Sequence, residues 1–440
     1  MKAKTTVLHI FPHAGGGVGS VLRALLAAET ASDSPFIHQA ASLEYLNEKT
    51  KIHFDAHGIA WLDEVAQRHH ERLNELLVRA DIVLVHWWNH PLVYRFLHLG
   101  LPPVRLLIWS HVNGYFAPQI FFPALLEMPD LFLFTSATSL KAPAVLALSD
   151  TSRQNLRVIR SCLGIPAGAQ DMPVKSDPFC AGYVGTVEAV KMHKDFLTMC
   201  ADAQMPAPCI VAGGADHEKL RQKAAALNIA DRFDILGPIP DATDVFRKIH
   251  AFAYPLSPRH YGTGEQVIIE AMAFGAVPVV LANPPEKALV RHNETGLIAQ
   301  NAAEFSAALN RLQADPQERL RLAAGGRRFV LEECGIEHSL RAFHDVFQTV
   351  LALPKRPRRL TLPAAFDGVA DGSPLHLFLA SLGDTPERAN FERLLQGDRS
   401  VILPVDFASK TRGTPQHYLS MLGQDEKLES ICRNLAVEEI

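Results

Sequence analysis

The sequence predicts an α/β protein of two domains, each built on a parallel β-sheet covered by helices. Short apolar runs rich in β-branched residues alternate with segments of helical periodicity between residues 5 and 353, and parallel strands need such crossover helices. An irregular stretch from Ser161 to Pro178, with several glycines and prolines, divides the alternation into two similar halves. Loops containing glycine follow several strands, at the sheet edge where open α/β sheets bind ligands.

The composition is that of a soluble globular protein with room for two domains and an appendage. The chain has 440 residues, of which 48% are hydrophobic and 20% charged. A formal net charge of −4 argues against a nucleic-acid partner. The six cysteines lack CxxC or CxxxH spacing, so we expect reduced thiols, a cytoplasmic location and no metal site. The apolar run Thr5–Phe11 is too short for a signal peptide, and no segment approaches the roughly 20 apolar residues that span a bilayer.

The first half opens with a strand at Thr5–Phe11, a glycine-rich turn at 12–19 and a helix at Val18–Glu29. Such a turn lets a ligand approach the backbone, and the alternative is a tight turn that only packs the helix on the sheet. Its glycine spacing is not that of a dinucleotide-binding loop. Further strands are expected at Phe36–Ala40, Asp81–His86, Val104–Trp109, Leu131–Thr135 and Val158–Ile159, with helices at Trp61–Arg79 and Pro91–Leu99.

Polar residues gather where two of these strands end. The run DIVLVHWWNHP places His86, Asn89 and His90 at one carboxyl edge, and LLIWSHVNGYF places His111 at another. Histidines there are suited to donate to a sugar hydroxyl or a phosphate, because ligands bind at the carboxyl ends of strands in open α/β sheets. The alternative is that they cap loops; a functional role is favoured for His111 more than for His86.

The second half repeats the alternation. Its expected helices include Glu218–Leu227 and Ala242–Ile249, followed by three more at Ala303–Leu312, Pro316–Glu333 and Glu337–Leu353. A ligand pocket between the two predicted domains is expected, because such interfaces favour pockets. Strands are expected at Ala181–Gly185, Cys209–Ala212, Phe233–Leu236, His250–Tyr254, Val277–Leu281 and Thr295–Ala299.

The stretch Tyr254–Leu281 carries the clearest chemistry. A strand end leads through a loop with prolines and glycines directly into a helix near Glu265–Phe274, and Gly275 can end that helix in a left-handed conformation. The first amides of such a helix have no partners and suit an anion such as a diphosphate. One carboxylate, Glu270, interrupts the apolar run of the helix. This combination predicts a nucleotide-sugar pocket.

The chain changes character after Pro354. The segment LPKRPRRLTLP places four basic residues among prolines and is typical of a stiff, basic connector. The remainder has helical patches and no catalytic motif. We therefore divide the chain into a first Rossmann-like domain at 1–165, a second at 166–353, and a mainly helical C-terminal extension of unknown role at 354–440.

Several of these motifs together resemble the family 4 glycosyltransferases, whose GT-B fold consists of two facing Rossmann-like domains. The resemblance covers about residues 5–352 and rests on the early GGG loop, IWSH, YVGTVEAVKMHKDF, VAGG and, as the most specific, EQVIIEAMAFGAVPVV. It implies retaining transfer of a sugar from a nucleotide-diphosphate sugar, with no required cofactor or metal. The donor is then expected mainly on the second domain and the acceptor mainly on the first.

The resemblance also implies roles for residues around the donor. Glu270 corresponds to the carboxylate that accepts hydrogen bonds from the ribose hydroxyls, which suits an acceptor-only group. Lys191 corresponds to the lysine that binds the diphosphate and stabilises the leaving group; the alternative is a solvated loop lysine. Further donor contacts are expected from Gly213, Ile239, Arg259, Gly264, Gln266 and Val267.

On the acceptor side, the resemblance places His111 near the transferred sugar. The loop of Gly15, Gly16 and Gly17 corresponds to one that closes on donor and acceptor. The aromatic segment Tyr115–Met128 could receive a lipid-linked acceptor, and the alternative is that it belongs to the core, with a glycan as acceptor.

Two positions depart from the family pattern. The usual first glutamate would fall at Gly262, so either Glu265 replaces it from a shifted position, as a catalytic candidate, or its contact is lost. On a helix Glu265 and Glu270 would lie about 140° apart around the axis, so they cannot grip one hydroxyl pair. Thr186 stands where the family often has an arginine of the phosphate clamp. Lys194, His193 or Arg259 could supply that charge, and Arg259 is favoured because its loop leads into the phosphate-binding helix.

The main hypothesis is therefore a glycosyltransferase of polysaccharide or glycoconjugate assembly. The alternative from another class is a catalytically weak GT-B protein that serves as a partner or scaffold subunit. A third is another GT-B enzyme, such as a sugar-nucleotide epimerase or a phosphorylase. The basic connector could rest on an anionic membrane, which would place a cytoplasmic protein peripherally at the inner membrane face.

Overall fold

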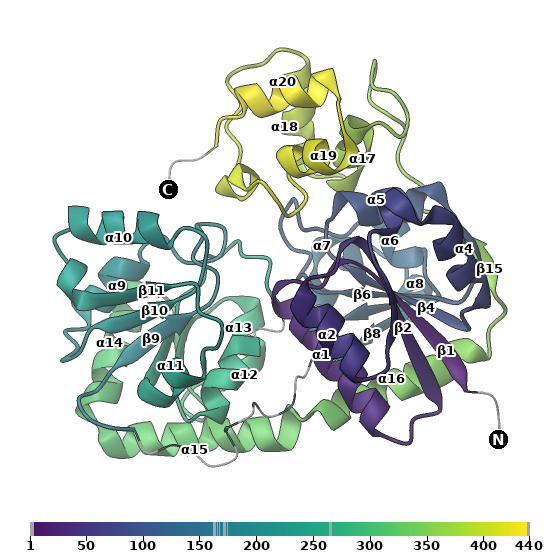
Figure 1. Ribbon diagram of the computed structural model, residues 1–440. Helices are drawn as coiled ribbons and strands as arrows, with labels where there is room; N and C mark the ends of the chain where they lie inside the picture. Colours follow the sequence, from purple (N-terminus) through teal and green to yellow (C-terminus); the bar gives the residue numbers. More distant parts are fainter. Residues whose placement is uncertain are drawn as a thin grey trace. The chain divides into compact units, whose positions relative to one another are not determined.

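The computed structural model describes residues 4–437 apart from 162, 163, 165, 167, 170–172, 174, 264 and 265. Contacts divide the chain into two compact units (Figure 1). The first unit takes in residues 1–161 and 336–439, and the second residues 162–335. This division differs from the predicted one after residue 335, because the last long helix and the C-terminal extension pack within the first unit.

The first unit is built on a seven-stranded, wholly parallel sheet of order β3-β2-β1-β4-β6-β7-β8. The order reverses between β1 and β4, and ligands of open α/β sheets bind at the carboxyl ends beside such a reversal. Both β4 and β6 are buried from end to end, as expected for strands covered on both faces. The strands are β1 (Thr5–His13), β2 (Phe36–Tyr45), β3 (Ala60–Leu62), β4 (Ile82–Trp87), β6 (Leu106–Ser110), β7 (Leu131–Phe134) and β8 (Leu156–Val158).

Helices α1 and α16 lie side by side against this sheet. A Cβ at Gly19 would lie 1.9 Å from the carbonyl oxygen of Ala14, so only glycine lets α1 start so close to the end of β1. The amphipathic α16 turns Phe343, Phe347 and their neighbours inward. The helices are α1 (Gly16–Ala31), α2 (Glu48–Ala56), α3 (Val65–Arg68), α4 (His70–Arg79), α5 (Pro91–Leu99), α6 (Pro123–Glu127), α7 (Pro143–Leu146), α8 (Asp150–Arg153) and α16 (Ile336–Leu351).

The long helix predicted at Trp61–Arg79 is wrong. Its first residues form the edge strand β3, and the remainder is split into α3 and α4 at His69, whose ψ of 41° is not helical. Glu64, with φ of 51°, makes the left-handed turn that joins β3 to α3. The sequence periodicity missed this break because no glycine or proline marks it.

The second unit has a six-stranded parallel sheet of order β11-β10-β9-β12-β13-β14. Its order reverses between β9 and β12, which places the ligand edge at the loops after these two strands. The strands are β9 (Ala181–Val184), β10 (Cys209–Ala212), β11 (Phe233–Gly237), β12 (Ala251–Tyr254), β13 (Val277–Leu281) and β14 (Leu297–Ala299). The helices are α9 (Phe196–Asp202), α10 (His217–Ala226), α11 (Thr243–Lys248), α12 (Gln266–Ala273), α13 (Pro284–Leu289), α14 (Ala302–Ala314) and α15 (Pro316–Glu333).

The C-terminal extension packs on the first unit, where α17 and α19 contact α5 (Figure 1). Its basic connector is anchored: Arg358 pairs with Asp130, and the side chains of Lys355 and Arg359 hydrogen-bond the carbonyls of Val78 and His98. The connector also pairs with β5 (Leu101–Val104) in a two-stranded antiparallel sheet. The extension comprises β15 (Arg356–Arg358), α17 (Pro374–Ser381), α18 (Pro386–Leu395), α19 (Pro415–Leu422) and α20 (Glu426–Asn434).

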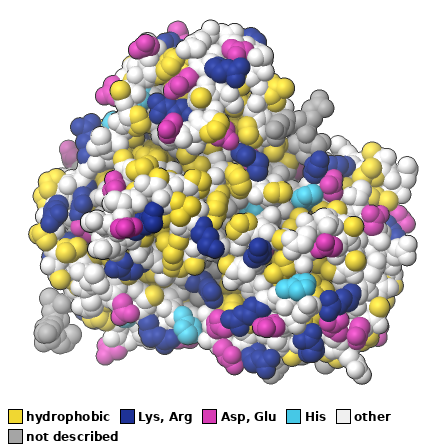
Figure 2. Space-filling model, turned by 180° about the vertical axis from the view of Figure 1, so that it is seen from behind, with side chains coloured by type: hydrophobic (Ala, Val, Ile, Leu, Met, Phe, Trp, Pro, Cys, Tyr) yellow, Lys and Arg dark blue, Asp and Glu magenta, His cyan; other side chains and the backbone are white. Residues whose placement is uncertain are grey.

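On the face shown in Figure 2, charged side chains of both signs are interspersed. Such mixing, with a formal net charge of −4, gives no extended field of one sign on that face. Among the helices of the described residues, none combines the length and the apolar character that crossing a membrane requires.

Candidate functional site

The loops after β9 and β12 are tied together at the strand reversal of the second unit. The amide of Ser257 donates to the carbonyl of Lys191 at 2.8 Å, and the amide of His193 donates to that of Pro255 at 3.0 Å. These bonds form a short antiparallel bridge that holds the backbone of Lys191 at the ligand edge. Its ammonium lies 6.0 Å from the ring centroid of Tyr254 and 5.9 Å from that of Tyr261. Lys191 is thus oriented by two aromatic faces.

Glycines keep side chains away from the neighbouring strand ends. Gly213 has a φ of +120°, and a Cβ there would lie 2.2 Å from the carbonyl oxygen of Gly185. Its amide donates to the carbonyl of Gly237 at 2.7 Å. The glycine at 213 therefore lets the loops after β9, β10 and β11 approach one another closely.

Glu270 lies on α12, partly buried beside the loop after β11. Burial, and secondarily the negative charge of Asp241, raise the pKa of its carboxyl to about 7. The predicted base-binding residue Ile239 precedes Asp241 in this loop and is partly exposed. The structure therefore brings Glu270 to the segment where the sequence predicts the nucleoside. Gly275 follows α12 with φ of +72°, so the left-handed helix end is confirmed.

The start of α12 is described from Gln266 onward, where Gln266 and Val267 are partly exposed. Two predicted residues, Gly264 and Glu265, lie outside the described residues, so the departure from the family pattern at Glu265 stays a prediction.

A buried pair that the sequence did not reveal anchors the loop before α12. His260 and Glu286 lie 3.0 Å apart (Nε2 to Oε1) with almost no exposure. The amide of Gly262 donates to Nδ1 of His260 at 3.1 Å, so Nε2 carries the proton toward Glu286. Arg259 precedes this pair and is partly exposed, whereas Lys194 is fully exposed. A histidine inside a loop and a glutamate 26 residues later carry no spacing signal.

The predicted glycine loop is shorter than expected: at the strand reversal of the first unit only Ala14 and Gly15 separate β1 from α1, and Gly16 and Gly17 begin the helix. Gly16 has a φ of +57°, and a Cβ at Gly16 or Gly17 would meet no atom within 4 Å. Gly15 donates its amide to Nδ1 of His13 at 3.2 Å. Because the packing of the described residues does not require glycine at position 17, the open space beside it is suited to a ligand.

Three residues gather next to that loop: His13 at the end of β1, Glu44 near the end of β2, and His90 after β4. Their ligand atoms lie within 4.8 Å of one another, close enough to hold a metal ion. Nδ1 of His13 and of His90 accepts a backbone N–H, from Gly15 and Leu92, so the neutral rings carry their proton on Nε2. Nε2 of His90 donates to Glu44 at 3.2 Å. The cluster therefore offers N–H donors and a carboxylate, which suits hydroxyl groups better than a cation.

Aromatic rings and the C-terminal extension border this cluster. Tyr45 stacks on His13 at 5.5 Å, and Trp88 meets the same ring edge-on at 5.3 Å. His417 of α19 packs against His90 at 4.6 Å between ring centroids. Burial, and then the ring of His90, lower the pKa of His417 to about 3, so it is neutral. The sequence missed Glu44 because it predicted β2 to end at Ala40.

Asn89 belongs to the docking of the extension and not to the ligand edge. Its side-chain oxygen accepts from the hydroxyl of Tyr418 at 2.9 Å, and its nitrogen donates to the hydroxyl of Ser381 at 3.1 Å. A Cβ at Gly413 would lie 2.3 Å from Cγ of Asn89. The polar groups of Asn89, which suggested a binding residue, form hydrogen bonds within the protein.

His111 is partly exposed at the carboxyl end of β6, and Trp88 lies 6.4 Å from its ring. Its Nε2 lies 3.0 Å from Nδ1 of His86, which is fully buried. Burial lowers the pKa of His86 to about 3, and burial followed by the ring of His86 lowers that of His111. Both rings are neutral. The structure thus places His111 near Trp88 and His13, and places His86 beneath it.

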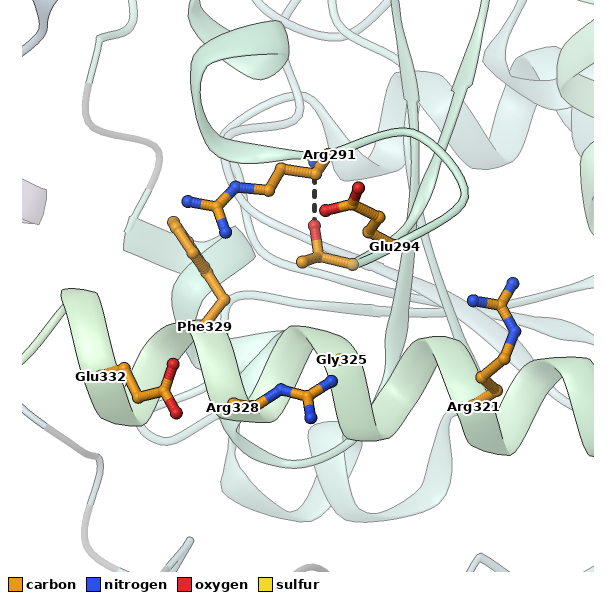
Figure 3. A pocket seen from close by; sticks show the side chains of 8 residues that line it. Arg291, Glu294, Arg321, Gly325, Arg328, Phe329 and Glu332 are labelled. Carbon is orange, nitrogen blue, oxygen red and sulfur yellow. Dashed lines mark hydrogen bonds between the residues drawn. The ribbon is translucent and has the colours of Figure 1, made fainter.

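A separate pocket of about 230 Å³ lies between α15 and the loop before β14 (Figure 3). Arg291 stacks on Phe329 at 4.9 Å and pairs with Glu333, and its amide donates to the hydroxyl of Thr295 at 2.9 Å. The pocket is at the amino end of β14, away from the loops described above. Its arginine contacts fasten α15 to the sheet.

Two doubly wound parallel sheets with candidate sites at their carboxyl edges define the class: the chain has the GT-B fold of glycosyltransferases. Residues 169–329, which include the edge loops of the second unit, match the family model described as Glycosyl transferases group 1. Among solved structures, Anabaena HepE in complex with UDP is similar with a TM-score of 0.59 at 16% identity, covering 78% of this chain and 100% of that one. HepE has also been solved in complex with UDP-glucose.

Two curated proteins are similar to this chain in sequence. The chain is 31% identical over 132 residues to an uncharacterized glycosyltransferase of Haemophilus influenzae, covering 29% of this chain and 36% of that protein. It is 27% identical over 196 residues to a D-inositol 3-phosphate glycosyltransferase of Thermomonospora curvata, covering 40% of this chain and 45% of that protein. The chain thus spans less than half the length of either relative. The resemblance to glycosyltransferases with this fold is confirmed.

Proposed function

We propose that this protein transfers a sugar from a nucleotide-diphosphate sugar to a hydroxyl acceptor with retention of configuration. The observation that carries the proposal is the edge of the second unit. There the bridged loops hold Lys191, Gly213 lets the strand-end loops approach one another closely, and a partly buried Glu270 lies beside the predicted nucleoside segment. The retaining course and the assignment to family 4 come from the sequence resemblance.

On the donor side, each residue has a defined task. The ammonium of Lys191 attracts the diphosphate and gains strength as negative charge grows on the leaving group. Glycine at position 213 lets the diphosphate approach the loop after β10 closely, and the start of α12 gives it amide donors. Ionised Glu270 accepts the two ribose hydroxyls, and Arg259 supplies the charge that Thr186 lacks.

On the acceptor side, we assign the cluster of His13, Glu44 and His90 to the hydroxyls of the acceptor. Nε2–H donors and a carboxylate acceptor together match a polyol or sugar, and the faces of Tyr45 and Trp88 offer apolar contact to its C–H groups. A hexosyl donor of the UDP-glucose type and a polyol acceptor agree with what HepE was solved with and with the name of the inositol-phosphate relative.

The cellular setting follows from that chemistry. We place the protein in polysaccharide or glycoconjugate assembly, in the cytoplasm or peripherally at the inner membrane face, with a glycan or lipid-linked acceptor. Because Lys355, Arg358 and Arg359 already contact the first unit, membrane contact would need other cations than these three.

Hydrolysis of a panel of nucleotide sugars tests the proposal. Wild type should slowly release nucleoside diphosphate from at least one donor, because water replaces the acceptor. Lys191→Ala should lower this rate by at least about 100-fold, the usual loss when a charge-stabilising group is removed. Lys287→Ala is the control, since Lys287 is an exposed lysine of α13 in the same unit.

The same panel decides between the proposal and its alternative. The missing clamp arginine at Thr186 favours a catalytically weak partner or scaffold subunit as the second candidate. Binding of a nucleotide without release of product from any donor would support that candidate. If no nucleotide sugar bound and none released nucleoside diphosphate, the assignment of a donor site to this protein would be wrong.

A further inference from the structure

Three buried histidines and the partly exposed His111 form one hydrogen-bonded line across the sheet of the first unit. They come from four neighbouring strands: His38 from β2, His9 from β1, His86 from β4, and His111 at the end of β6. Nδ1 of His38 lies 2.8 Å from Nε2 of His9, and Nδ1 of His9 lies 3.0 Å from Nε2 of His86. The last step, Nδ1 of His86 to Nε2 of His111, is also 3.0 Å.

The line starts at a carboxylate. Glu29 of α1 is buried, and its Oε2 lies 3.7 Å from Nε2 of His38. Neither of these two atoms has a hydrogen-bond partner among the described residues. The other oxygen of Glu29 lies 2.8 Å from Nε2 of His344, a partly exposed residue of α16. Burial by itself would raise the pKa of Glu29, but the polar contacts of His38 and Ser34 and the ring of His344 lower it, so the carboxyl is ionised.

The carboxylate at one end selects the direction of the hydrogen bonds in the line. Burial lowers the pKa of His9, His86 and His111, so each of these rings is neutral and carries one N–H. A neutral ring with both nitrogens bonded, as in His9 and His86, donates with one and accepts with the other. The ionised Glu29 lies 3.7 Å from Nε2 of His38, too far for a hydrogen bond, but its charge favours the tautomer with the proton on that nitrogen. Each following ring then donates from Nε2, and at the far end Nδ1 of His111 is left as a bare acceptor at the ligand edge.

We propose that this histidine line is a proton relay that carries the proton of the acceptor hydroxyl from His111 to Glu29. The proposal rests on the transferase function given above. The hydroxyl proton moves to Nδ1 of His111, and the Nε2 proton of each ring moves to Nδ1 of the next, until His38 protonates Glu29.

The reaction then balances without another reactant. The acceptor oxygen forms its bond to the sugar carbon, and the bond from that carbon to the diphosphate breaks with the electron pair leaving on the diphosphate. Every histidine gains one proton and loses one, so no ring in the buried line becomes charged. His344 gives the proton a partly exposed way out to water.

The side chains packed around the histidine line explain why its rings stay neutral. Phe11 packs edge-on against His86, Trp109 lies over both His86 and His111, and Phe347 of α16 contacts His38. These apolar rings exclude water from the line and disfavour a charged imidazole. Buried polar rings such as His9 and His86, each bonded at both nitrogens, are costly to arrange for packing alone.

The tautomers are measured directly by ¹⁵N-histidine NMR on the full-length protein, which needs no substrate. His111 of wild type should show a protonated Nε2 and a bare Nδ1, with its signals assigned by their loss in His111→Gln. Glu29→Gln puts an amide that donates as well as accepts opposite His38, so a second set of His111 signals with Nδ1 protonated should appear. Glu75→Gln, on the exposed side of α4, should change nothing.

Kinetics supply the second measurement. His9→Gln keeps a donor and an acceptor in the line but cannot exchange its protons, so kcat for transfer should fall about 10-fold or more while the nucleotide Kd is unchanged. A protonated Nδ1 on His111 of wild type, or no response of His111 to Glu29→Gln, overturns the relay. Failure of the transferase function itself would appear separately, as a wild type with the predicted tautomers and no donor turnover.

Discussion

At the scale of single residues, the ionised form of Glu270 that suits the proposed nucleotide binding is also the form that lowers the stability of the folded protein. Its carboxyl has a pKa of about 7 in the folded protein against an ordinary 4.5, chiefly because it is buried. The native state therefore holds a proton that the unfolded chain has lost, and stability falls as pH rises from about 4.5 to about 7. The proposed role would account for this cost, because the ionised carboxylate is the form suited to accept two ribose hydroxyls.

Glu270→Gln should accordingly stabilise the protein at pH 8 and leave it almost unchanged near pH 4.5. The gain is at most about 3 kcal/mol, since one pKa unit corresponds to 1.36 kcal/mol and partial exposure reduces the cost. Urea unfolding of both proteins at pH 5 and pH 8 measures the difference. Glu294→Gln, an exposed glutamate of the same unit, is the control. The same variant should bind the nucleotide sugar more weakly; a loss of stability at pH 8 would contradict the argument.

At the scale of secondary-structure elements, two buried tyrosines lie where the extension packs on α5, and within the described part of the chain only one of their hydroxyls forms a hydrogen bond. Tyr418 of α19 donates to Asn89, whereas the hydroxyl of Tyr94 on α5 has no hydrogen-bond partner among the described residues. Both rings are fully buried and lie 6.4 Å apart. Removing the hydroxyl of Tyr418 and removing that of Tyr94 should therefore have different effects on the stability of the first unit.

Tyr418→Phe should destabilise the first unit by about 1–3 kcal/mol, because it leaves the oxygen of Asn89 buried without that donor. Tyr94→Phe should be neutral or slightly stabilising, because it removes a buried hydroxyl that gains nothing. Thermal and urea unfolding of the two variants against wild type give the comparison. Equal losses in both would mean that the hydroxyl of Tyr418 does not fasten the extension.

Most strands could be predicted from the sequence, because buried parallel strands such as β4 and β6 are short apolar runs bounded by polar residues. The edge strand β3 could not, since its three residues, Ala60–Leu62, carry no alternation. The end of β2 was missed for a related reason: Ser42 and Glu44 interrupt the apolar pattern while still pairing in the sheet or at its edge. Strands at the borders of a sheet have too few buried positions to produce a recognisable hydrophobic pattern in the sequence.

The residues proposed for the donor site stand out in the sequence because they sit in one contiguous motif around Glu270 and in the loop of Lys191, and their roles stay predictions. The acceptor cluster does not stand out in this way. His13, Glu44, His90 and His417 are scattered over the chain and meet only through the strand order and the docking of α19. The histidine line has the same character: each member occupies one strand, and only the register of four strands puts them in contact.

At the scale of the whole molecule, the residues proposed for the donor and those proposed for the acceptor fall in different contact units. Residues 162–335 hold Lys191, Gly213 and Glu270, and residues 1–161 with 336–439 hold the glycine loop, the acceptor cluster and the histidine line. Each unit has its own strand reversal and its own edge loops. The extension belongs to the acceptor unit, so its influence on the reaction is expected to be on acceptor choice and not on nucleotide affinity.

Hydrogen exchange with a bound nucleotide tests that division. UDP should slow amide exchange in the edge loops of the second unit, at 186–194, 213–214, 237–241 and 255–263, because these loops form the proposed donor site. Exchange at 44–47 and 88–90 of the first unit should stay unchanged until an acceptor is added. Lys191→Ala measured at the same UDP concentration should show little protection anywhere. Protection of 44–47 and 88–90 by UDP alone would instead place the nucleotide at the acceptor cluster, and the donor and acceptor assignments would have to be exchanged.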